Sequence, residues 1–482
     1  MSTVAGIDVS PDHYIGGRRV ASAERFEDRS PVDGLLLAEV ARGGSTEVEA
    51  AVAAATAAFP AWAALGPAGR APYLRRLAGL IDANIDRLAA VECLDMAMLE
   101  RSLRARVIAR GARNYRSYAE LAEAHRERAW LSNRTENRVI RMPSGPAAVI
   151  TPWNAPFMLS TWKTAPALAA GCTVVLKPAE WSPLSCSILA DLTAEAGFPA
   201  GVFNVVQGIG EEAGAALVSH PGVRRVSFTG SPETGRLIGA AAAANIVPFT
   251  AELGGKSPLV VLADADVEAA AAKAAGQYDD AGQNCMAGTR LLVDESIAED
   301  FLARFHRHAD AHVLGDPRDD ATTVTPLIHP DHLARVEGFV DRARAAGDRI
   351  VRGGRRVDGG GLLYEPTLIE PRSNESEVVQ KEVFGPVLTF QTFASEDEAV
   401  ALANSTRYGL AAIVYTRSRE RAERIGRAIR AGTVWVNSFL VRDLTAPFGG
   451  TGISGIGREG GDYALDFYSD LKTLQILEGS TE

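Results

Sequence analysis

The sequence predicts an α/β protein with two doubly wound α/β domains, and three observations support this class. Short runs rich in Val, Ile and Leu alternate along the chain with segments of helical periodicity. Such runs are typical of strands that are buried on both faces of a parallel sheet. The chain has 482 residues, which is too long for one ordinary hydrophobic core. The alternation restarts near residue 255, so we expect a second domain from there.

The first series begins with helices. Hydroxyl and acidic residues at 45–47 predict a helix start, a second helix follows from Pro67, and a third covers roughly residues 101–128. Strands are then expected at 147–153, 173–178, 203–208 and 225–230, with helices at 157–170, 183–196 and 232–244.

The second series is expected to repeat this pattern. Two segments fit neither series, the polar stretch 132–145 and the strand-like stretch 469–477. Lone strands of this kind often pair with a neighbouring subunit, and an edge hairpin within one chain is an equal alternative. The predicted elements of the second series include strands at 258–262, 290–294 and 433–437 and helices at 266–280 and 297–313.

Composition excludes several classes of partner. The net charge of −10 argues against nucleic acid or an anionic membrane surface, because both require a cationic face. No apolar run reaches the ~18–20 residues of a membrane-spanning helix. The first residues also lack the basic-then-apolar order of a secretory signal. We therefore expect a cytoplasmic protein.

Four cysteines are scattered along the chain, at 93, 172, 186 and 285. None forms a C-x-x-C pair and none has a nearby histidine at ligand spacing, which argues against a metal site or a redox dithiol. Three of them are interpreted as small buried residues. Cys285, in DDAGQNCMAGTR, lies between an expected helix and strand among small residues, where a substrate can reach it. Considered alone, a cysteine between glycines is more often structural than catalytic.

Two polar residues lie where core strands end. Glu252, in FTAELGGKSP, separates an apolar strand from a Gly-Gly turn, which favours a general base with a shifted pKa. A helix cap or an exposed turn acid is the alternative for Glu252. Asn154, in ITPWNAPF, can donate its amide to a developing oxyanion, or it can form a turn ahead of Pro156.

A second group of residues is suited to a nucleotide. Lys177 and Glu180, in VVLKPAEWSP, can hold ribose hydroxyls, and Gly230 and Gly235 lie in a strand-to-helix turn that suits a phosphate. The stretch 208–214 approximates G-x-G-x-x-G. It has one residue too many and two acids where a pyrophosphate would lie, so we reject it as a dinucleotide fingerprint.

Six motifs together carry a family resemblance. TPWN, VVLKPAE, FTGS-x-x-x-G, ELGGKS, GQ-x-C and KEVFGPV occur in an order and spacing that resemble the aldehyde dehydrogenase superfamily over nearly the whole chain. The resemblance implies oxidation of an aldehyde to an acid through a thioester on Cys285, with Glu252 as the base for deacylation. It also implies that Asn154 and the Cys285 backbone N–H form the oxyanion hole.

The resemblance implies further roles and an organisation. Lys163 and Glu459 match positions of a proton-relay pair, and the protein is expected to be a homodimer or homotetramer. The implied domains are NAD-binding at 1–128 and 144–252, catalytic at 253–453, and a small β oligomerisation element at 129–143 and 454–482. The implied cofactor is NAD, preferred over NADP because the carboxylate of Glu180 would face a 2′-phosphate. The implied cofactor residues are Glu382 and Phe384 at the nicotinamide end and Trp153, Lys177, Glu180, Gly230, Ser231 and Gly235 along the adenosine and phosphates.

The stretch 435–472 is similar to the branch that oxidises muconic-type semialdehydes from aromatic ring cleavage. Arg110 and Arg442 fall where that branch places arginines on substrate carboxylates, which an arginine can clamp with two parallel hydrogen bonds. A solvated basic helix face is the alternative for Arg110. The segment 95–100 departs from the D-x-G-K/R-P pattern of relatives at the substrate entrance.

Three alternatives to a semialdehyde dehydrogenase remain. One is a general aldehyde dehydrogenase for neutral or aromatic aldehydes. A non-catalytic scaffold would be favoured by the loss of Cys285 or Glu252, and both residues are present. A CoA-acylating dehydrogenase is disfavoured, because that group generally lacks an acid at the Glu252 position.

Overall fold

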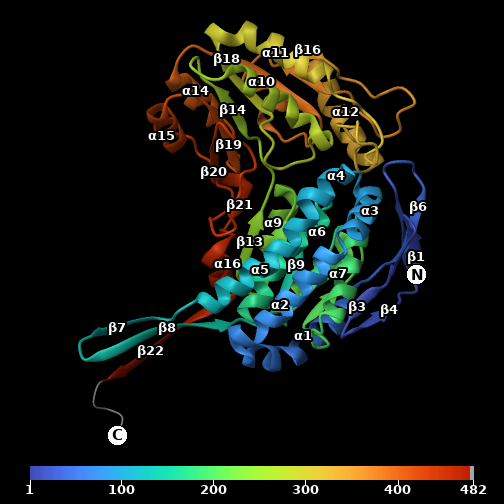
Figure 1. The fold of residues 1–482 in the computed structure, drawn as a ribbon, viewed down its shortest axis with the longest axis vertical. Helices are drawn as coiled ribbons and strands as arrows, with labels where there is room; N and C mark the ends of the chain where they lie inside the picture. The colour runs from blue at the N-terminus through green and yellow to red at the C-terminus, as the bar shows by residue number, and fades with distance from the viewer. Residues whose placement is uncertain (478–482) are drawn as a thin grey trace.

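A computed structural model of the chain describes residues 1–477. It contains two lobes, each built on a large sheet with helices on its faces, and a β arm that projects from one lobe (Figure 1). The predicted α/β class is confirmed.

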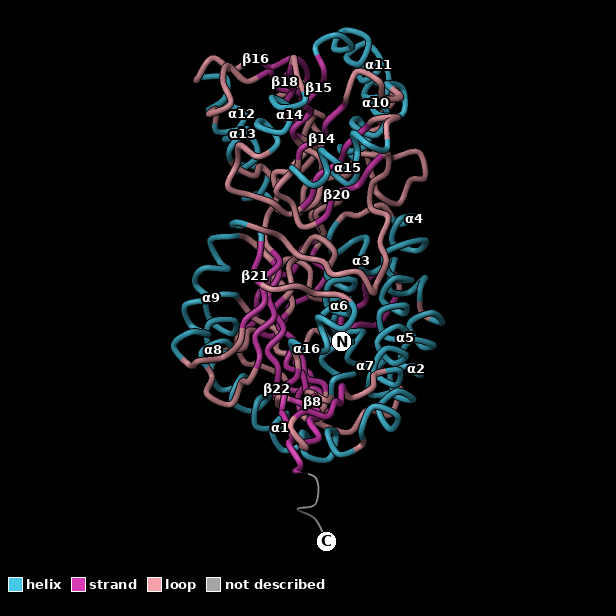
Figure 2. The backbone as a smooth tube through the Cα atoms, turned by 90° about the vertical axis from the view of Figure 1, so that its left-hand side faces the viewer, coloured by secondary structure: helices cyan, strands magenta, loops and turns pink. Residues whose placement is uncertain are grey.

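The first sheet has eight strands in the order β21-β13-β12-β9-β10-β11-β3-β4. Its five central strands are parallel, as their continuous apolar sequences predict. Figure 2 shows α8 (Ala215–Ser219) and α9 (Pro232–Ala244) on one side of these strands and α2 (Gly66–Ala83) and α5 (Ala109–Ala124) on the other. The strands are β9 (Pro146–Ile150), β10 (Thr173–Lys177), β11 (Phe203–Val205), β12 (Arg225–Thr229) and β13 (Phe249–Glu252), with β3 (His13–Ile15), β4 (Arg18–Val20) and β21 (Gly455–Ile456) added in antiparallel orientation.

The second sheet has seven strands in the order β16-β17-β18-β15-β14-β19-β20. Six are parallel, and β16 is antiparallel at one edge. The strands are β14 (Pro258–Val261), β15 (Arg290–Asp294), β16 (Arg349–Arg352), β17 (Thr367–Glu370), β18 (Val387–Phe393), β19 (Ala411–Tyr415) and β20 (Thr433–Val436). The main helices are α10 (Val267–Ala275), α11 (Ala298–Asp310), α12 (Pro330–Ala345), α14 (Glu396–Ala403) and α15 (Arg419–Ala428).

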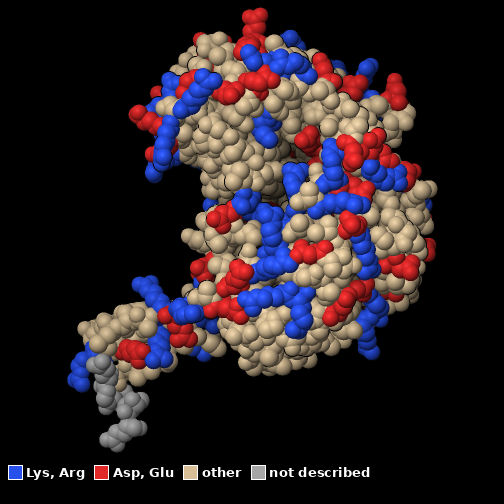
Figure 3. All heavy atoms as spheres, in the orientation of Figure 1, with Lys and Arg blue, Asp and Glu red and all other residues tan. Residues whose placement is uncertain are grey.

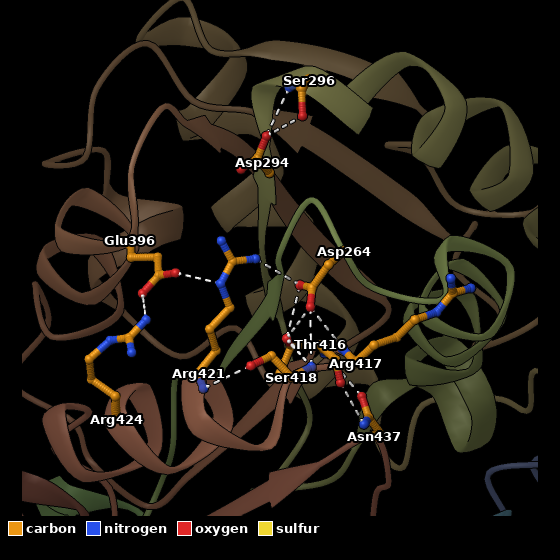
Figure 4. Close-up of polar contacts among 10 residues, drawn as sticks. All are labelled: Asp264, Asp294, Ser296, Glu396, Thr416, Arg417, Ser418, Arg421, Arg424 and Asn437. Carbon is orange, nitrogen blue, oxygen red and sulfur yellow. Dashed lines mark hydrogen bonds and ion pairs between the residues drawn. The ribbon is translucent and has the colours of Figure 1, made fainter.

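The loop from β19 to α15 is fixed by polar contacts at the free edge of this sheet (Figure 4). Both carboxylate oxygens of Asp264 accept hydrogen bonds from the Thr416 hydroxyl at 2.9 Å, and Asp264 Oδ2 also accepts from the Ser418 N–H. Arg421 bridges Asp264 and Glu396. A surface hollow of about 550 Å³ lies here between α15 and the edge strand β20.

The two segments that fit neither series pair with each other within the chain. The arm has three antiparallel strands, β7 (Arg128–Ser132), β8 (Thr135–Pro143) and β22 (Ser469–Leu477), with Ser469 opposite Pro143 and Leu477 opposite Thr135. Apolar side chains are exposed along it, including Trp130, Leu131, Met142, Leu471 and Leu474.

The boundaries of the expected β element at 454–482 differ at its start. Residues 455–456 form β21, which pairs with β13 of the first sheet, and α16 (Gly461–Phe467) packs on α5 and on α6 (Pro156–Ala170). The expectation for 478–482 lies outside the described residues.

Two expected helices are interrupted. The helix expected over 101–128 is α4 (Glu100–Ser102), a π-helix (Leu103–Ile108) and α5, and it ends at Ala124 because His125 turns to extended geometry. The helix expected over 266–280 ends as α10 at Ala275. The residues that follow are part of the site described below.

Among residues 1–477 no single helix has the length and apolarity to cross a membrane, although α1 (Ser45–Ala64) and α2 together pass that test as a pair bent by 115°. Over the same residues no group of three or more His, Cys, Asp or Glu side chains has a metal-binding arrangement.

Candidate active site

The turn that joins the two sheets passes directly over Cys285. Strand β13 ends at Glu252, and a Gly-Gly turn then leads to β14. A Cβ on Gly255 would lie 2.3 Å from the Cys285 carbonyl oxygen, so this approach requires glycine. The structure therefore brings Glu252 and Cys285, which are 33 positions apart, into one site.

The chain before Cys285 has an unusual backbone. Asp280 and Ala281 have positive φ values of 52° and 56°, which is costly for residues with a Cβ. The segment is held by the Asp280 carboxylate, which accepts from Leu99 N–H at 3.1 Å, and by Gln283 Oε1, which accepts from Ile328 N–H at 3.0 Å. The expected helix over 266–280 cannot continue through this segment.

Asn154 lies beside the nucleophile. Its Nδ2 donates to the Gln283 carbonyl at 3.0 Å, two residues before Cys285. An amide donor placed at the segment that carries the thiol can stabilise an oxyanion that forms there. The alternative role of Asn154, a turn ahead of Pro156, would need a hydrogen bond from the backbone to its side chain. Among the described residues its side chain instead donates to the segment that carries Cys285.

The surroundings of Cys285 favour its protonated thiol. Burial, together with the acids Glu382 and Glu252, raises the pKa of this thiol to about 12, and the charge of Arg442 opposes the shift. The other three cysteines are fully buried, and Cys285 is partly exposed. A thiol in this state needs a proton acceptor before it can attack.

Glu252 is a buried carboxyl without a hydrogen-bond partner among the described residues. Its Oε1 lies against Gly449, where a Cβ would come within 2.7 Å. Burial and the neighbouring Glu459 raise the pKa of Glu252 well above its ordinary value, and Lys163 and Arg442 oppose this shift. An uncompensated buried carboxyl is costly when ionised, so this group is suited to gain and lose a proton.

Lys163 and Glu459 form a buried ion pair. Lys163 Nζ lies 2.5 Å from Glu459 Oε1, and it also donates to Ser227 Oγ at 3.1 Å and to the Phe228 carbonyl at 3.2 Å. The other carboxylate oxygen of Glu459 accepts from the Trp162 indole N–H at 2.6 Å. The two residues expected as a relay are therefore in contact.

Arg110 and Arg442 lie over the same tryptophan ring. Their guanidinium carbons are 5.5 Å and 5.3 Å from the Trp162 centroid, and Arg442 is also 3.7 Å from the Phe448 centroid. Arg442 Nη1 is 3.9 Å from the sulfur of Met286, which follows Cys285. Within residues 1–477 neither arginine forms an ion pair with a carboxylate.

The charges of these arginines act on each other. Burial, together with the proximity of Arg442, lowers the pKa of Arg110 to about 10. Figure 3 shows that basic and acidic side chains are interspersed on the face of the molecule that is drawn there. Arg104, Arg106 and Arg113 of the same helical segment are exposed, whereas Arg110 is half-buried and faces Trp162. Arg110 therefore does not lie on a solvated basic helix face, the alternative that the sequence offered.

Lys177 and Glu180 face each other after β10. Lys177 Nζ donates to Glu180 Oε2 at 2.9 Å and to the Pro178 carbonyl at 3.0 Å. Burial raises the pKa of Glu180, but the charge and hydrogen bond of Lys177 outweigh burial, so the net pKa is lowered. Glu180 is therefore ionised.

The stretch 208–214 lies beside Lys177 and Glu180. The glycine spacing of this stretch did not predict that location. Residues Gly210–Gly214 form a short π-helix. A Cβ on Gly210 would lie 4.0 Å from Glu180 Oε1, and one on Gly214 would lie 3.8 Å from Lys177 Cδ. The stretch is one wall of the site around Glu180.

The start of α9 supplies the strand-to-helix turn. Ser231 is the N-cap, and its Oγ accepts from Thr234 N–H at 3.1 Å. A Cβ on Gly235 would lie 2.8 Å from Leu253, and one on Gly230 would lie 2.4 Å from the Phe228 ring. These glycines allow the helix start to approach the strand that ends in Glu252.

Glu382 reaches the same Gly-Gly turn from the opposite side. Its Oε1 accepts from Gly255 N–H at 2.8 Å, and a Cβ on Gly254 would lie 2.1 Å from Oε2. Burial raises the pKa of Glu382 to about 7. Phe384, at φ 63°, places its ring edge-on to Trp153 at 5.3 Å.

Two residues of α12 that the sequence reasoning missed hold this loop. Arg335 donates to the carbonyls of Val383 at 2.5 Å and Glu382 at 2.9 Å. His332 Nε2 is 2.7 Å from the Phe384 carbonyl. No motif marks these two residues, because they act on backbone atoms about 50 positions away.

Comparison with known proteins is consistent with this geometry. The aldehyde dehydrogenase family model matches residues 19–474. The 2-hydroxymuconic semialdehyde dehydrogenase of Pseudomonas sp. (strain CF600) is 40% identical over 480 residues, which cover 96% of this chain and 99% of that protein. The 5-carboxymethyl-2-hydroxymuconate semialdehyde dehydrogenase of Escherichia coli is 40% identical over 463 residues, covering 94% and 98%.

A solved structure shares the whole architecture. Indole-3-acetaldehyde dehydrogenase of P. syringae, a mutant in complex with NAD+ and IAA, superposes with a TM-score of 0.95 at 39% identity. The match covers 98% of this chain and 97% of that one.

Proposed function

This chain belongs to the aldehyde dehydrogenase family, and on that premise we propose that it oxidises a carboxylate-bearing aldehyde to the acid, with NAD as cofactor. The observation that carries the proposal is the pair Arg110 and Arg442, two half-buried cations on the Trp162 ring without a carboxylate partner among residues 1–477. Arg442 also contacts Met286, the residue that follows Cys285. The names of two relatives, both semialdehyde dehydrogenases, support the same substrate class.

The chemistry begins at Cys285. Its thiol passes its proton to solvent, to which Cys285 is partly exposed, and Sγ forms a bond to the aldehyde carbon, which places negative charge on the former carbonyl oxygen. We assign stabilisation of this oxyanion to Asn154 Nδ2, which lies at the segment that carries Cys285, and to the Cys285 N–H; losing one such donor typically costs ~10²–10³ in rate. NAD, when bound, supplies the acceptor for the hydride that leaves this carbon and thereby makes a thioester on Cys285 possible.

Hydrolysis of the thioester uses Glu252. The ionised carboxylate removes a proton from water, the resulting oxygen attacks the thioester carbon, and the carbon–sulfur bond breaks to release the acid and the thiolate. Glu252 then has to lose its proton. We assign this step to the ion pair of Lys163 and Glu459, because both charges act on Glu252 and the two residues are in direct contact with each other.

The residues present fit NAD. Glu180 is ionised and its carboxylate can accept from ribose hydroxyls. Gly255 N–H holds Oε1 of Glu382, which leaves Oε2 to accept from a second hydroxyl. The glycines at 230, 235 and 254 allow the Phe228, Leu253 and Glu382 side chains to pack closely against the turns around these carboxylates.

NAD is expected to exceed NADP in kcat/KM by about tenfold or more. The ionised carboxylate of Glu180 repels a 2′-phosphate, and Lys177 only partly offsets this charge because it is already bonded to Glu180. Glu180→Gln should lower the ratio of kcat/KM for NAD to that for NADP. Glu195→Gln, at an exposed position, should leave this ratio unchanged. Steady-state kinetics with both cofactors measure this, and equal efficiency in the wild type contradicts the assignment.

A muconic-type semialdehyde fits the arginine pair. Two guanidinium groups over one ring repel each other, and burial adds a desolvation cost. A carboxylate bound between them relieves both costs through charge-assisted hydrogen bonds. Such a substrate places its carboxylate some distance from its aldehyde, as the location of Arg442 beside Met286 requires.

Arg442→Ala tests the substrate class. We expect kcat/KM for 2-hydroxymuconic semialdehyde to fall roughly 30-fold or more, because removal of one partner of a desolvated charge pair costs ~2–5 kcal/mol. Benzaldehyde should change less than about threefold. Arg113→Ala, which removes an exposed arginine of the same helix as Arg110, is the matched control.

The outcomes separate the alternatives. A parallel loss for both substrates would identify Arg442 as structural. A wild type that prefers benzaldehyde would favour a general aldehyde dehydrogenase, for which the apolar groups Trp162, Phe448 and Met286 around the thiol and the P. syringae relative are the supporting observations.

We further propose that the protein is a cytoplasmic homodimer or homotetramer. Its four cysteines are free thiols, as is usual in a reducing compartment. The arm exposes leucines at positions 131 and 471 to 60% and 59%, and it projects away from both lobes. A second copy of the chain would cover this apolar surface.

A further inference from the structure

Trp162 contacts both functional halves of the site. It lies on α6 with only 4% of its surface exposed, and its indole N–H donates to Glu459 Oε2 at 2.6 Å. The face of its ring lies under the guanidinium groups of Arg442 and Arg110 at 5.3 Å and 5.5 Å. One rigid side chain thus joins the relay to the arginine pair.

The indole N–H completes the hydrogen bonding of Glu459. Oε1 is held by Lys163 at 2.5 Å and by Ser227 Oγ at 3.3 Å, so Oε2 depends on Trp162. A buried carboxylate oxygen without a donor is costly, and the carboxylate would turn to find another donor. That turn would displace Glu459 from Lys163 and from the electrostatic contact with Glu252.

The indole ring holds two like charges close together. The negative face of an aromatic ring attracts cations, most strongly for tryptophan. Arg442 lies between this ring and Phe448, whose centroid is 3.7 Å away. Tyr118 packs edge-on against Trp162 at 6.3 Å, so the ring itself is fixed. The position of the ring therefore sets the position of both arginines relative to Cys285.

We propose that Trp162 is a positioning residue with two separable functions: its N–H fixes Glu459 for thioester hydrolysis, and its ring face fixes Arg110 and Arg442 for an anionic aldehyde. The second function rests on the proposed function above. The first does not depend on the charge of the substrate, so the two can fail independently.

Two substitutions separate these functions in the full-length protein with NAD. Trp162→Phe removes the N–H and keeps an aromatic face, whereas Trp162→Leu removes both. With benzaldehyde, Trp162→Phe should lower the steady-state kcat about tenfold and produce a burst of about one NADH per active site, because loss of a hydrogen bond to a charged group affects hydrolysis and spares the preceding steps. Its ratio of kcat/KM for 2-hydroxymuconic semialdehyde to that for benzaldehyde should stay within about threefold of wild type.

Trp162→Leu should show the same burst with benzaldehyde, and its substrate ratio should fall about tenfold because both arginines lose their ring. Trp62→Phe is the matched control. Trp62 is buried and donates its N–H to the carbonyl of Leu168, also on α6 but away from Glu459, at 3.2 Å. This variant should keep the wild-type burst and substrate ratio.

Each outcome decides one function. If Trp162→Phe slows the burst and the steady state equally, the N–H has no positioning role. If Trp162→Leu keeps the wild-type preference for the semialdehyde, the ring has none. If the wild type itself lacks that preference, the proposed substrate class fails, and the benzaldehyde burst still tests the N–H.

Discussion

Replacing Cys285 by alanine is expected to abolish NADH formation from any aldehyde substrate and to leave NAD binding within about threefold of wild type. The thiol supplies the bond that holds the substrate through hydride transfer and hydrolysis, and no other cysteine can replace it, because Cys93, Cys172 and Cys186 are fully buried. Loss of a catalytic nucleophile costs on the order of 10⁴ in turnover or more.

The measurement pairs a steady-state assay with NAD titration by fluorescence or calorimetry. Cys93→Ala is the matched control, because it removes a thiol in α3 (Ile85–Met96) whose side chain lies outside the site. That variant should keep wild-type turnover. Retention of more than a few per cent of turnover by Cys285→Ala contradicts the assignment.

Local patterns predicted the elements of this fold well. The strand at 290–294 and the helix at 232–244 have the expected bounds, since apolar runs and capping residues act over a few positions. The pairing of β8 with β22 joins segments more than 300 positions apart, and β21 pairs with β13 across about 200 positions. No local pattern contains such pairings.

For the site, too, local motifs were predicted from the sequence and long-range contacts were not. Motifs located the residues to which we assign the chemistry, and the structure places Asn154 at the segment that carries Cys285 and the turn after Glu252 against the Cys285 carbonyl. The sequence did not indicate that Gly254 and Gly255 separate Glu382 from the Cys285 backbone, because close approach is a property of the folded chain. The contact of Arg442 with Trp162 likewise joins positions 280 apart.

Glu252→Gln should separate two steps that Cys285→Ala removes together. Acylation and hydride transfer do not require the base for water, so we expect a burst of about one NADH per active site. The steady state should then fall by roughly 10²–10⁴, the usual contribution of a general base. Because burial and Glu459 raise the pKa of Glu252, its active ionised form gains population as the pH rises. Wild-type hydrolysis should therefore accelerate with pH and level off once Glu252 is ionised, and the variant should lack this titration.

Stopped-flow measurement of NADH followed by the steady-state rate tests this at several pH values. Glu92→Gln is the control, because burial also raises the pKa of that carboxyl, to about 8, while it bonds Phe157 N–H away from the thiol. It should keep the wild-type ratio of burst to steady state. An equal loss of both phases in Glu252→Gln would identify a structural carboxyl. A preserved burst with slow turnover would place Glu252 at the hydrolysis step, which is the role that its two unpaired oxygens favour.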